Sequence, residues 1–204
     1  MEIATFPVTP FLENCFVVKN DGEAIVVDPG EAAGEILRSI EGLTVRLIIN
    51  THCHCDHCGG NADMVKATGA PLAIHEAELP LLQSVEAQGQ MFGCYFPPSP
   101  VPDQFLDEGS EIQVSGTSLR VVHAPGHSPG HIMLAGDGFL IAGDVIFAGS
   151  IGRTDLPGGN HAQLLESIRN KVLTLPDETV VYCGHGPSTT VGRERATNPF
   201  LVGL

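Results

Sequence analysis

Residues 50–60 constrain the chain most, because they read Asn-Thr-His-Cys-His-Cys-Asp-His-Cys-Gly-Gly. Four candidate metal ligands, His52, His54, Asp56 and His57, fall within six residues. Imidazole and carboxylate donors suit zinc, iron or manganese better than calcium or magnesium. The alternative is a solvated polar loop, which would gain little from crowding these groups together. The segment therefore predicts a metal site.

The residues in front of this cluster predict a buried β-strand, since residues 44–49 read Thr-Val-Arg-Leu-Ile-Ile. In an extended segment that leaves a strand, alternate side chains point the same way. We therefore expect His52, His54 and Asp56 to converge on one point, with His57 leaning in from the neighbouring position. The strand would deliver the cluster at its carboxyl end.

Three cysteines inside the cluster offer a competing site, because Cys53, Cys55 and Cys58 form a C-x-C-x-x-C pattern. Thiolates are good zinc ligands. Alternation places Cys53 and Cys55 on the face opposite the histidines, however, so the two sets do not easily serve one ion. We favour the alternative that these cysteines pack as small apolar residues.

Later motifs complete a pattern that resembles the metallo-β-lactamase superfamily. The first part is H-x-H-x-D-H after a strand, and the later parts are Ala-Pro-Gly-His127-Ser-Pro-Gly-His131, Ile-Ala-Gly-Asp144 and Tyr-Cys-Gly-His185-Gly. The resemblance implies an α/β fold (α+β in some schemes), a four-layer αβ/βα sandwich of two mixed sheets flanked by helices. It also implies a single domain over residues 1–204.

The same resemblance implies a centre with two divalent metal ions, most simply zinc, with iron or manganese as alternatives. Seven side chains would be the ligands: His52, His54 and His127 on the first ion, Asp56, His57 and His185 on the second, and Asp144 bridging them. Two such ions lower the pKa of a shared water toward neutrality and prepare it to attack an acyl group. Asp56 would also accept or relay a proton as the catalytic carboxylate.

Two further residues are candidates near this centre. Asp28 matches an aspartate that the family carries near the metal edge, which implies that it orients a ligand. A plain turn role is the alternative for Asp28. Arg153 is the candidate for binding a substrate carboxylate, because a guanidinium group suits that partner. A structural ion pair with Asp155 is its alternative.

Residues 149–160 and 186–201 resemble the short bacterial and archaeal type II glyoxalases. Those are hydroxyacylglutathione hydrolases, which cleave thioesters such as S-lactoylglutathione to a hydroxy acid and a thiol. The long type II glyoxalases add a helical C-terminal domain that grips glutathione, whereas only residues 186–204 follow His185 here. The carrier thiol therefore stays open.

Several competing functions belong to the same superfamily. A single-iron persulfide dioxygenase also shows T-H-x-H-x-D-H and G-R-T-D stretches, and a lactonase is a further alternative. A class B β-lactamase is disfavoured, because Asp144 stands where many of those enzymes place a cysteine. A binding module without activity is disfavoured too, since none of the expected ligands is missing.

The resemblance implies a small-molecule thioester as the partner, and composition disfavours the other classes of partner. The formal charge of −14 disfavours nucleic acid, whose binding depends on Lys and Arg meeting phosphates. Neither a basic start followed by an apolar run nor a long apolar stretch is present, so we expect no export signal and no membrane contact. Six cysteines without such a signal favour reduced thiols in a cytoplasm. Oligomeric state is left open, and we expect Cys53, Cys55 and Cys183 to be sensitive to oxidants.

Periodicity predicts the remaining elements. Helices are expected near 31–41 and 60–68, over 76–90, and from Asn160-His161 to roughly residue 174, whereas the proline-rich residues 96–102 should be irregular. Strands are expected over 15–19, 24–27, 44–49, 71–75, 118–123, 132–135, 139–142 and 179–182.

Overall fold

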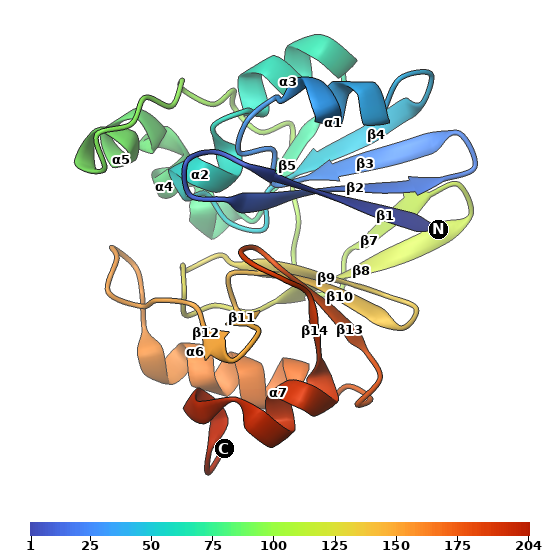
Figure 1. The fold of residues 1–204 in the computed structure, drawn as a ribbon. Helices are drawn as coiled ribbons and strands as arrows, with labels where there is room; N and C mark the ends of the chain where they lie inside the picture. Colours follow the sequence, from blue (N-terminus) through green and yellow to red (C-terminus); the bar gives the residue numbers. More distant parts are fainter. The chain divides into compact units, whose positions relative to one another are not determined.

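The computed structural model describes residues 1–204, which form two compact units. The first unit comprises residues 1–106 and 112–118, and the second comprises 107–111 and 119–204. Each unit is built on a mixed β-sheet with helices packed against it (Figure 1). None of the helices has the length and apolar character that a membrane crossing requires.

Sheet A of the first unit has six strands in sequential order. They are β1 (Glu2–Val8), β2 (Glu13–Asn20), β3 (Glu23–Val27), β4 (Thr44–Ile49), β5 (Leu72–Ile74) and β6 (Gln104–Phe105). The β1–β2 and β2–β3 pairs are antiparallel, whereas β3 to β6 run parallel. Asp21 and Gly22 join β2 to β3 with φ of 42° and 82°, as the left-handed positions of a tight hairpin require.

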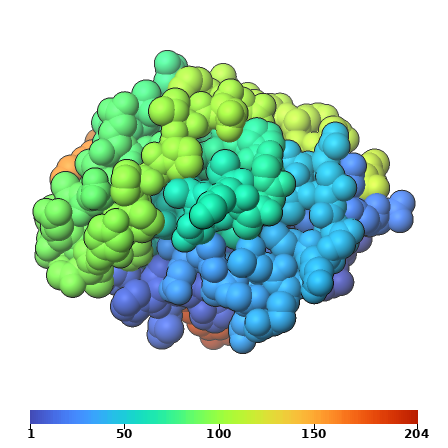
Figure 2. Space-filling view, turned by 90° about the horizontal axis from the view of Figure 1, so that it is seen from above, coloured from blue at the N-terminus to red at the C-terminus, as the bar shows by residue number.

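The helices of the first unit pack against sheet A. They are α1 (Gly34–Ser39), α2 (Cys55–Cys58), α3 (Asn61–Thr68), η1 (Glu76–Glu78), α4 (Leu79–Gln83) and α5 (Val85–Met91). Ile36 of α1 and Met64 of α3 are fully buried against Val17, Val26 and Ile48 of the sheet. Figure 2 shows the helical side of this unit, with α1 in blue, α3 in teal and the segment that contains α4 and α5 in green.

Sheet B has the strand order β14-β13-β10-β9-β8-β7. Its strands are β7 (Glu111–Val114), β8 (Thr117–His123), β9 (Ile132–Gly136), β10 (Phe139–Gly143), β13 (Val180–Cys183) and β14 (Thr189–Thr190). The β10–β13 pair is parallel, and the β8–β9, β9–β10 and β13–β14 pairs are antiparallel. A separate two-stranded ribbon joins β11 (Ile146–Phe147) to β12 (Ser150–Ile151).

Helices of the second unit bury the apolar face of sheet B. They are α6 (His161–Ser167), which continues into the π-helical turn η2 (Ile168–Val172), then α7 (Val191–Thr197) and η3 (Pro199–Leu201). Leu164 and Ile168 are fully buried in a cluster with Met133 and Val181. The Asn160 side chain caps α6 by accepting a hydrogen bond from the Gln163 backbone N–H at 3.1 Å.

The expected α/β class, with two mixed sheets flanked by helices, is confirmed. The helical segment after residue 76 and the irregular residues 96–102 are confirmed as well. One expectation is wrong: the chain does not stay extended as far as Asp56, because residues 55–58 turn into α2. A single domain over residues 1–204 stays a prediction.

Candidate metal centre

The first cluster of candidate ligands lies where the chain leaves β4. Residues 50–54 are irregular, and α2 begins at Cys55 with His54 as its N-cap. Side-chain alternation therefore extends only from His52 to His54, and Asp56 and His57 come from the helical turn. The physical reason is that the N–H groups of His57 and Cys58 bond back to the His54 carbonyl.

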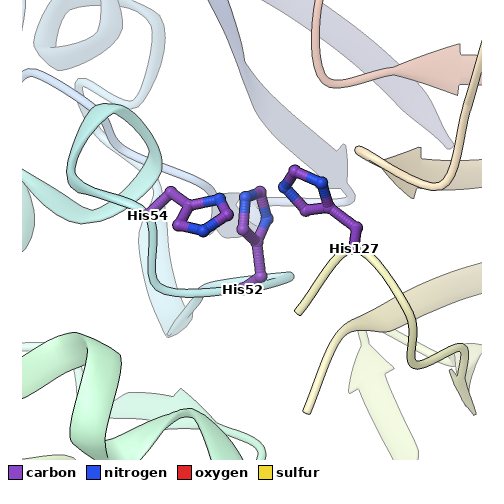
Figure 3. Close-up of side chains that lie close together, drawn as sticks. All are labelled: His52, His54 and His127. Carbon is purple, nitrogen blue, oxygen red and sulfur yellow. The ribbon is translucent and has the colours of Figure 1, made fainter. Parts of the chain in front are cut away.

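The His52 imidazole contacts two other imidazoles of this cluster. The ring centroids of His52 and His54 are 4.7 Å apart, nearly perpendicular, and those of His52 and His57 are 4.0 Å apart. Figure 3 shows the rings of His52 and His54 side by side on their loop. All three histidines are buried, whereas Asp56 is half-buried, with Oδ2 3.9 Å from His57 Nε2.

Asp28 orients two of these rings. Its Oδ1 accepts the Thr51 backbone N–H at 2.6 Å, and its Oδ2 accepts the Thr51 hydroxyl at 2.6 Å and His57 Nδ1 at 3.1 Å. Because that hydroxyl spends its one proton on Asp28, its oxygen can only accept from His52 Nδ1, which lies 3.1 Å away. Both rings then carry their proton on Nδ1, which leaves the Nε2 lone pair for a metal.

The second cluster lies at strand ends of sheet B. Asp144 directly follows β10, and His185 follows the parallel neighbour β13, so both leave the same edge of the sheet. Asp144 Oδ2 lies 3.5 Å from His127 Nε2 and 3.6 Å from His185 Nε2. Two ligands bonded at ~2.0–2.1 Å to one tetrahedral ion lie roughly 3.3 Å apart. Each of the two spacings fits a carboxylate that shares a metal ion with that histidine, as expected if Asp144 bridges two ions.

His127 is held by a group that sequence reasoning missed. Its Nδ1 donates to the backbone carbonyl of Arg153 at 2.8 Å, which leaves Nε2 unprotonated. Figure 3 shows His127 on the loop that follows β8. The second histidine of this motif, His131, accepts the Asp144 backbone N–H at 3.0 Å, so it orients Asp144. A carbonyl contact of this kind has no side-chain signature in a sequence.

Gly152 makes this arrangement sterically feasible. A Cβ at this position would lie 1.9 Å from the Asp144 carbonyl oxygen and 3.2 Å from His127 Nδ1. Real Cβ atoms do not approach a backbone oxygen as closely as the first of these distances. The loop after β12 therefore reaches His127 and Asp144 only because residue 152 has no side chain.

The Arg153 side chain forms an ion pair with Asp155 on the surface. Its Nε and Nη2 donate to the two carboxylate oxygens at 2.7 and 2.8 Å. The guanidinium lowers the pKa of Asp155 to about 2, and the carboxylate raises the pKa of Arg153. The structural alternative for Arg153 is therefore present, and its contact with substrate remains a prediction.

The three cysteines of residues 50–60 pack in an apolar cluster, and Cys58 also donates its S–H to the His54 carbonyl at 3.1 Å. Cys53, Cys55 and Cys58 are buried in a cluster with Ile74, Leu82, Val85 and Phe96. Burial raises the pKa of Cys53 well above its ordinary range and that of Cys55 to about 12. Burial likewise raises the pKa of Cys183 to about 12. Because the thiolate is the reactive form, these positions argue against the expected oxidant sensitivity.

Comparison with known proteins places the whole chain in one group. Residues 8–185 match the family model of the metallo-β-lactamase superfamily. A protein of Haemophilus influenzae named hydroxyacylglutathione hydrolase GloC is 37% identical, covering 98% of this chain and 98% of its own.

Two solved structures are similar over nearly the full length. The crystal structure of BLEG-1 B3 metallo-β-lactamase has a TM-score of 0.92 and 36% identity, covering 99% of this chain and 100% of its own. The crystal structure of TTHA1623 in a di-iron-bound form has a TM-score of 0.89 and 37% identity, covering 97% and 100%. The metallo-β-lactamase fold is thus shown for this chain.

Asp28→Asn should weaken zinc binding ~10–100-fold, the usual cost of losing a group that orients a metal ligand. The amide puts an N–H₂ where Thr51 or His57 donates, which favours the wrong tautomer. The measurement is competition between apoprotein and a chromophoric zinc chelator. Asp21→Asn is the matched control, because Asp21 shares the positive φ in an exposed turn. Equal zinc affinity in both variants would contradict the role given to Asp28.

Gly152→Ala should destabilise the fold by about 1–3 kcal/mol through overpacking and should also weaken zinc binding. The methyl group must push the Asp144 carbonyl or His127 aside. Urea unfolding and the chelator competition measure the two effects. Gly34→Ala is the control, because its Cβ meets only the end of the flexible Arg38 side chain at 3.3 Å. Wild-type behaviour of Gly152→Ala would rule out the steric argument.

Thiol labelling should show one fast cysteine and five slow ones in the native protein. Cys94 is half-buried, whereas the other five cysteines are buried. A colorimetric disulfide reagent would report a single rapid thiol, which Cys94→Ala removes, and six thiols in urea. Rapid labelling of Cys53 or Cys55 in the native state would restore the expectation of oxidant sensitivity.

Proposed function

Because this chain belongs to the metallo-β-lactamase superfamily, a superfamily of metallo-hydrolases, we propose that it is a thioester hydrolase of the type II glyoxalase kind. Its substrates would be hydroxyacyl thioesters such as S-lactoylglutathione. The observation that carries this choice is the 37% identity, over 98% of the chain, to a protein named hydroxyacylglutathione hydrolase. The carrier thiol is left open. Arg153 is the candidate for binding a carboxylate of that carrier.

The proposed cofactor is a pair of divalent metal ions, zinc in the first instance. Candidate ligands are the two clusters described above: His52, His54, Asp56, His57, His127, Asp144 and His185. The hydrogen bonds from His52, His57 and His127 through Nδ1 support this assignment, because each leaves Nε2 as the ligating atom. The di-iron form of a 37% identical neighbour supports iron as the alternative. When bound, the ions supply an acidified water and polarise the acyl carbonyl.

Hydrolysis requires a water to add to the thioester carbonyl carbon and the carbon–sulfur bond to break. Asp56 would take the proton of the water and pass it to the departing thiolate, so that the products are a hydroxy acid and a thiol. The Asp56 side chain keeps 16% of its surface exposed, so its carboxylate can exchange a proton with solvent. The Arg153 guanidinium would exchange Asp155 for a carboxylate of the carrier, since both partners of that pair are exposed.

A β-lactam hydrolase is the second candidate function. The 36% identity to a B3 metallo-β-lactamase with a TM-score of 0.92 favours it, and both reactions add water to an acyl carbon. The single-iron persulfide dioxygenase and the lactonase are two further candidates within the superfamily. In each case the partner is a small molecule, and we assign no nucleic acid or membrane role. A reducing cytoplasm suits six free cysteines.

The decisive measurement is a metal count paired with S-lactoylglutathione hydrolysis, followed as thiol release. The proposal expects two ions per chain, turnover that a chelator abolishes and zinc restores, and a loss of ~10²-fold or more in kcat/KM for Asp144→Asn, on the order expected when a catalytic metal is displaced. Asp137→Asn is the control, because Asp137 lies exposed in the β9–β10 turn of the same hairpin.

Three outcomes would replace this proposal. Hydrolysis of a chromogenic cephalosporin without thioester cleavage would favour the β-lactamase. One iron per chain with oxygen uptake on glutathione persulfide would favour the dioxygenase. Turnover of a lactone alone would favour the lactonase.

A further inference from the structure

The backbone around His54 is held by side chains from the helices that follow β5. Residues 50–54 have left sheet A, and their peptide groups need other hydrogen-bond partners. Glu78, the last residue of η1, supplies one of them: its Oε2 accepts the Cys53 N–H at 2.7 Å. The Glu78 side chain is fully buried.

Gln88 of α5 supplies partners for two peptide groups at once. Its Oε1 accepts the Cys55 N–H at 3.1 Å, and its Nε2 donates to the Cys53 carbonyl at 3.1 Å. The same Nε2 also lies 2.8 Å from the Leu81 carbonyl and 3.2 Å from Ser84 Oγ, so its two protons are shared among three acceptors, two of them in its own helical segment. The Gln88 side chain thus connects residues 53–55 to the segment of α4 and α5.

We propose that Glu78 and Gln88 are positioning residues for the candidate metal centre. Between them they hold the N–H groups on both sides of His54, and so they limit the backbone rotation that aims its ring. The backbone of His54 is extended, with φ −69° and ψ 149°, at the point where the chain turns into α2. This proposal rests on the metal centre proposed above and adds to it two residues that do not touch the ion.

The polar atoms of these two side chains serve the peptide groups that flank His54. Burying a carboxylate costs free energy unless hydrogen bonds compensate it. An apolar residue at either position would leave the Cys53 or the Cys55 N–H without this acceptor. The polar groups are directed at the peptides that flank a candidate ligand. Groups that orient metal ligands typically change metal affinity or activity ~10–100-fold when removed.

Gln88→Met tests the proposal, because methionine keeps the length of the side chain and removes its donor and acceptor. We expect zinc binding by the apoprotein, measured by chelator competition, to weaken ~10–100-fold relative to wild type. The visible spectrum of the cobalt(II) form should change as well, because it reports the geometry of the ligands. Gln90→Met is the matched control: Gln90 lies on the same helix and is exposed, so its affinity and spectrum should stay at wild-type values.

Substitutions of Glu78 test the proposal independently, because a conservative variant should recover the zinc affinity that an apolar variant loses. Glu78→Leu removes the acceptor and should weaken zinc binding, whereas Glu78→Gln keeps an oxygen for the Cys53 N–H and should retain most of the affinity. Glu76→Leu, an exposed residue of the same short helix, is the control. If Gln88→Met does not fold, Gln88→Glu replaces it: this variant keeps an acceptor for the Cys55 N–H but turns the donor into a carboxylate oxygen that repels the Cys53 carbonyl, so zinc binding should weaken again.

The melting temperature of the apoprotein separates positioning from stability. A variant that lowers this temperature while zinc affinity and the cobalt spectrum stay unchanged would overturn the proposal and leave a structural role. If wild type binds zinc and the variants bind it equally well, positioning fails and the proposed function stands. If the wild-type chain binds no divalent metal at all, both fail together.

Discussion

A neutral imidazole can bind a metal through one nitrogen only if its proton is held on the other, and that requirement applies to each of the two clusters of candidate ligands. Asp28 meets it for His57 directly and for His52 through the Thr51 hydroxyl. A backbone carbonyl, that of Arg153, meets it for His127. These acceptors are only useful at short range, so the turns after β3, β4, β8 and β12 must all be tightly defined.

The sequence allowed the fold class and the strand ends to be predicted, because short β-branched runs and ligand motifs follow one another regularly. Prediction failed at α2, because four residues are too few for a helical period to be visible. The family motifs supplied the candidate metal ligands. The positions of Asp56 and His57, however, depend on the hydrogen bonds that His57 and Cys58 donate to the His54 carbonyl, and no local sequence pattern predicts these bonds.

Glu78 and Gln88 could not be recognised beforehand, because a glutamate and a glutamine in a helical segment are most often solvated. Only the folded chain shows that Glu78 points inward while Glu76, two residues away, is exposed. The carbonyl of Arg153 is a still harder case, since every residue has one. The Arg153 side chain was the candidate for binding substrate, whereas its main-chain carbonyl makes the contact that orients His127.

The Arg153–Asp155 pair lies on the surface, where a substitution of either residue disturbs little of the structure. An exposed ion pair contributes little free energy, so an incoming anion can replace Asp155 at small net cost. The main-chain carbonyl of the same arginine is needed by His127 whatever side chain it bears. Position 153 can therefore change in charge and length while His127 keeps its Nδ1 proton, so that in the proposed function the recognition of the carrier could change without disturbing a candidate metal ligand.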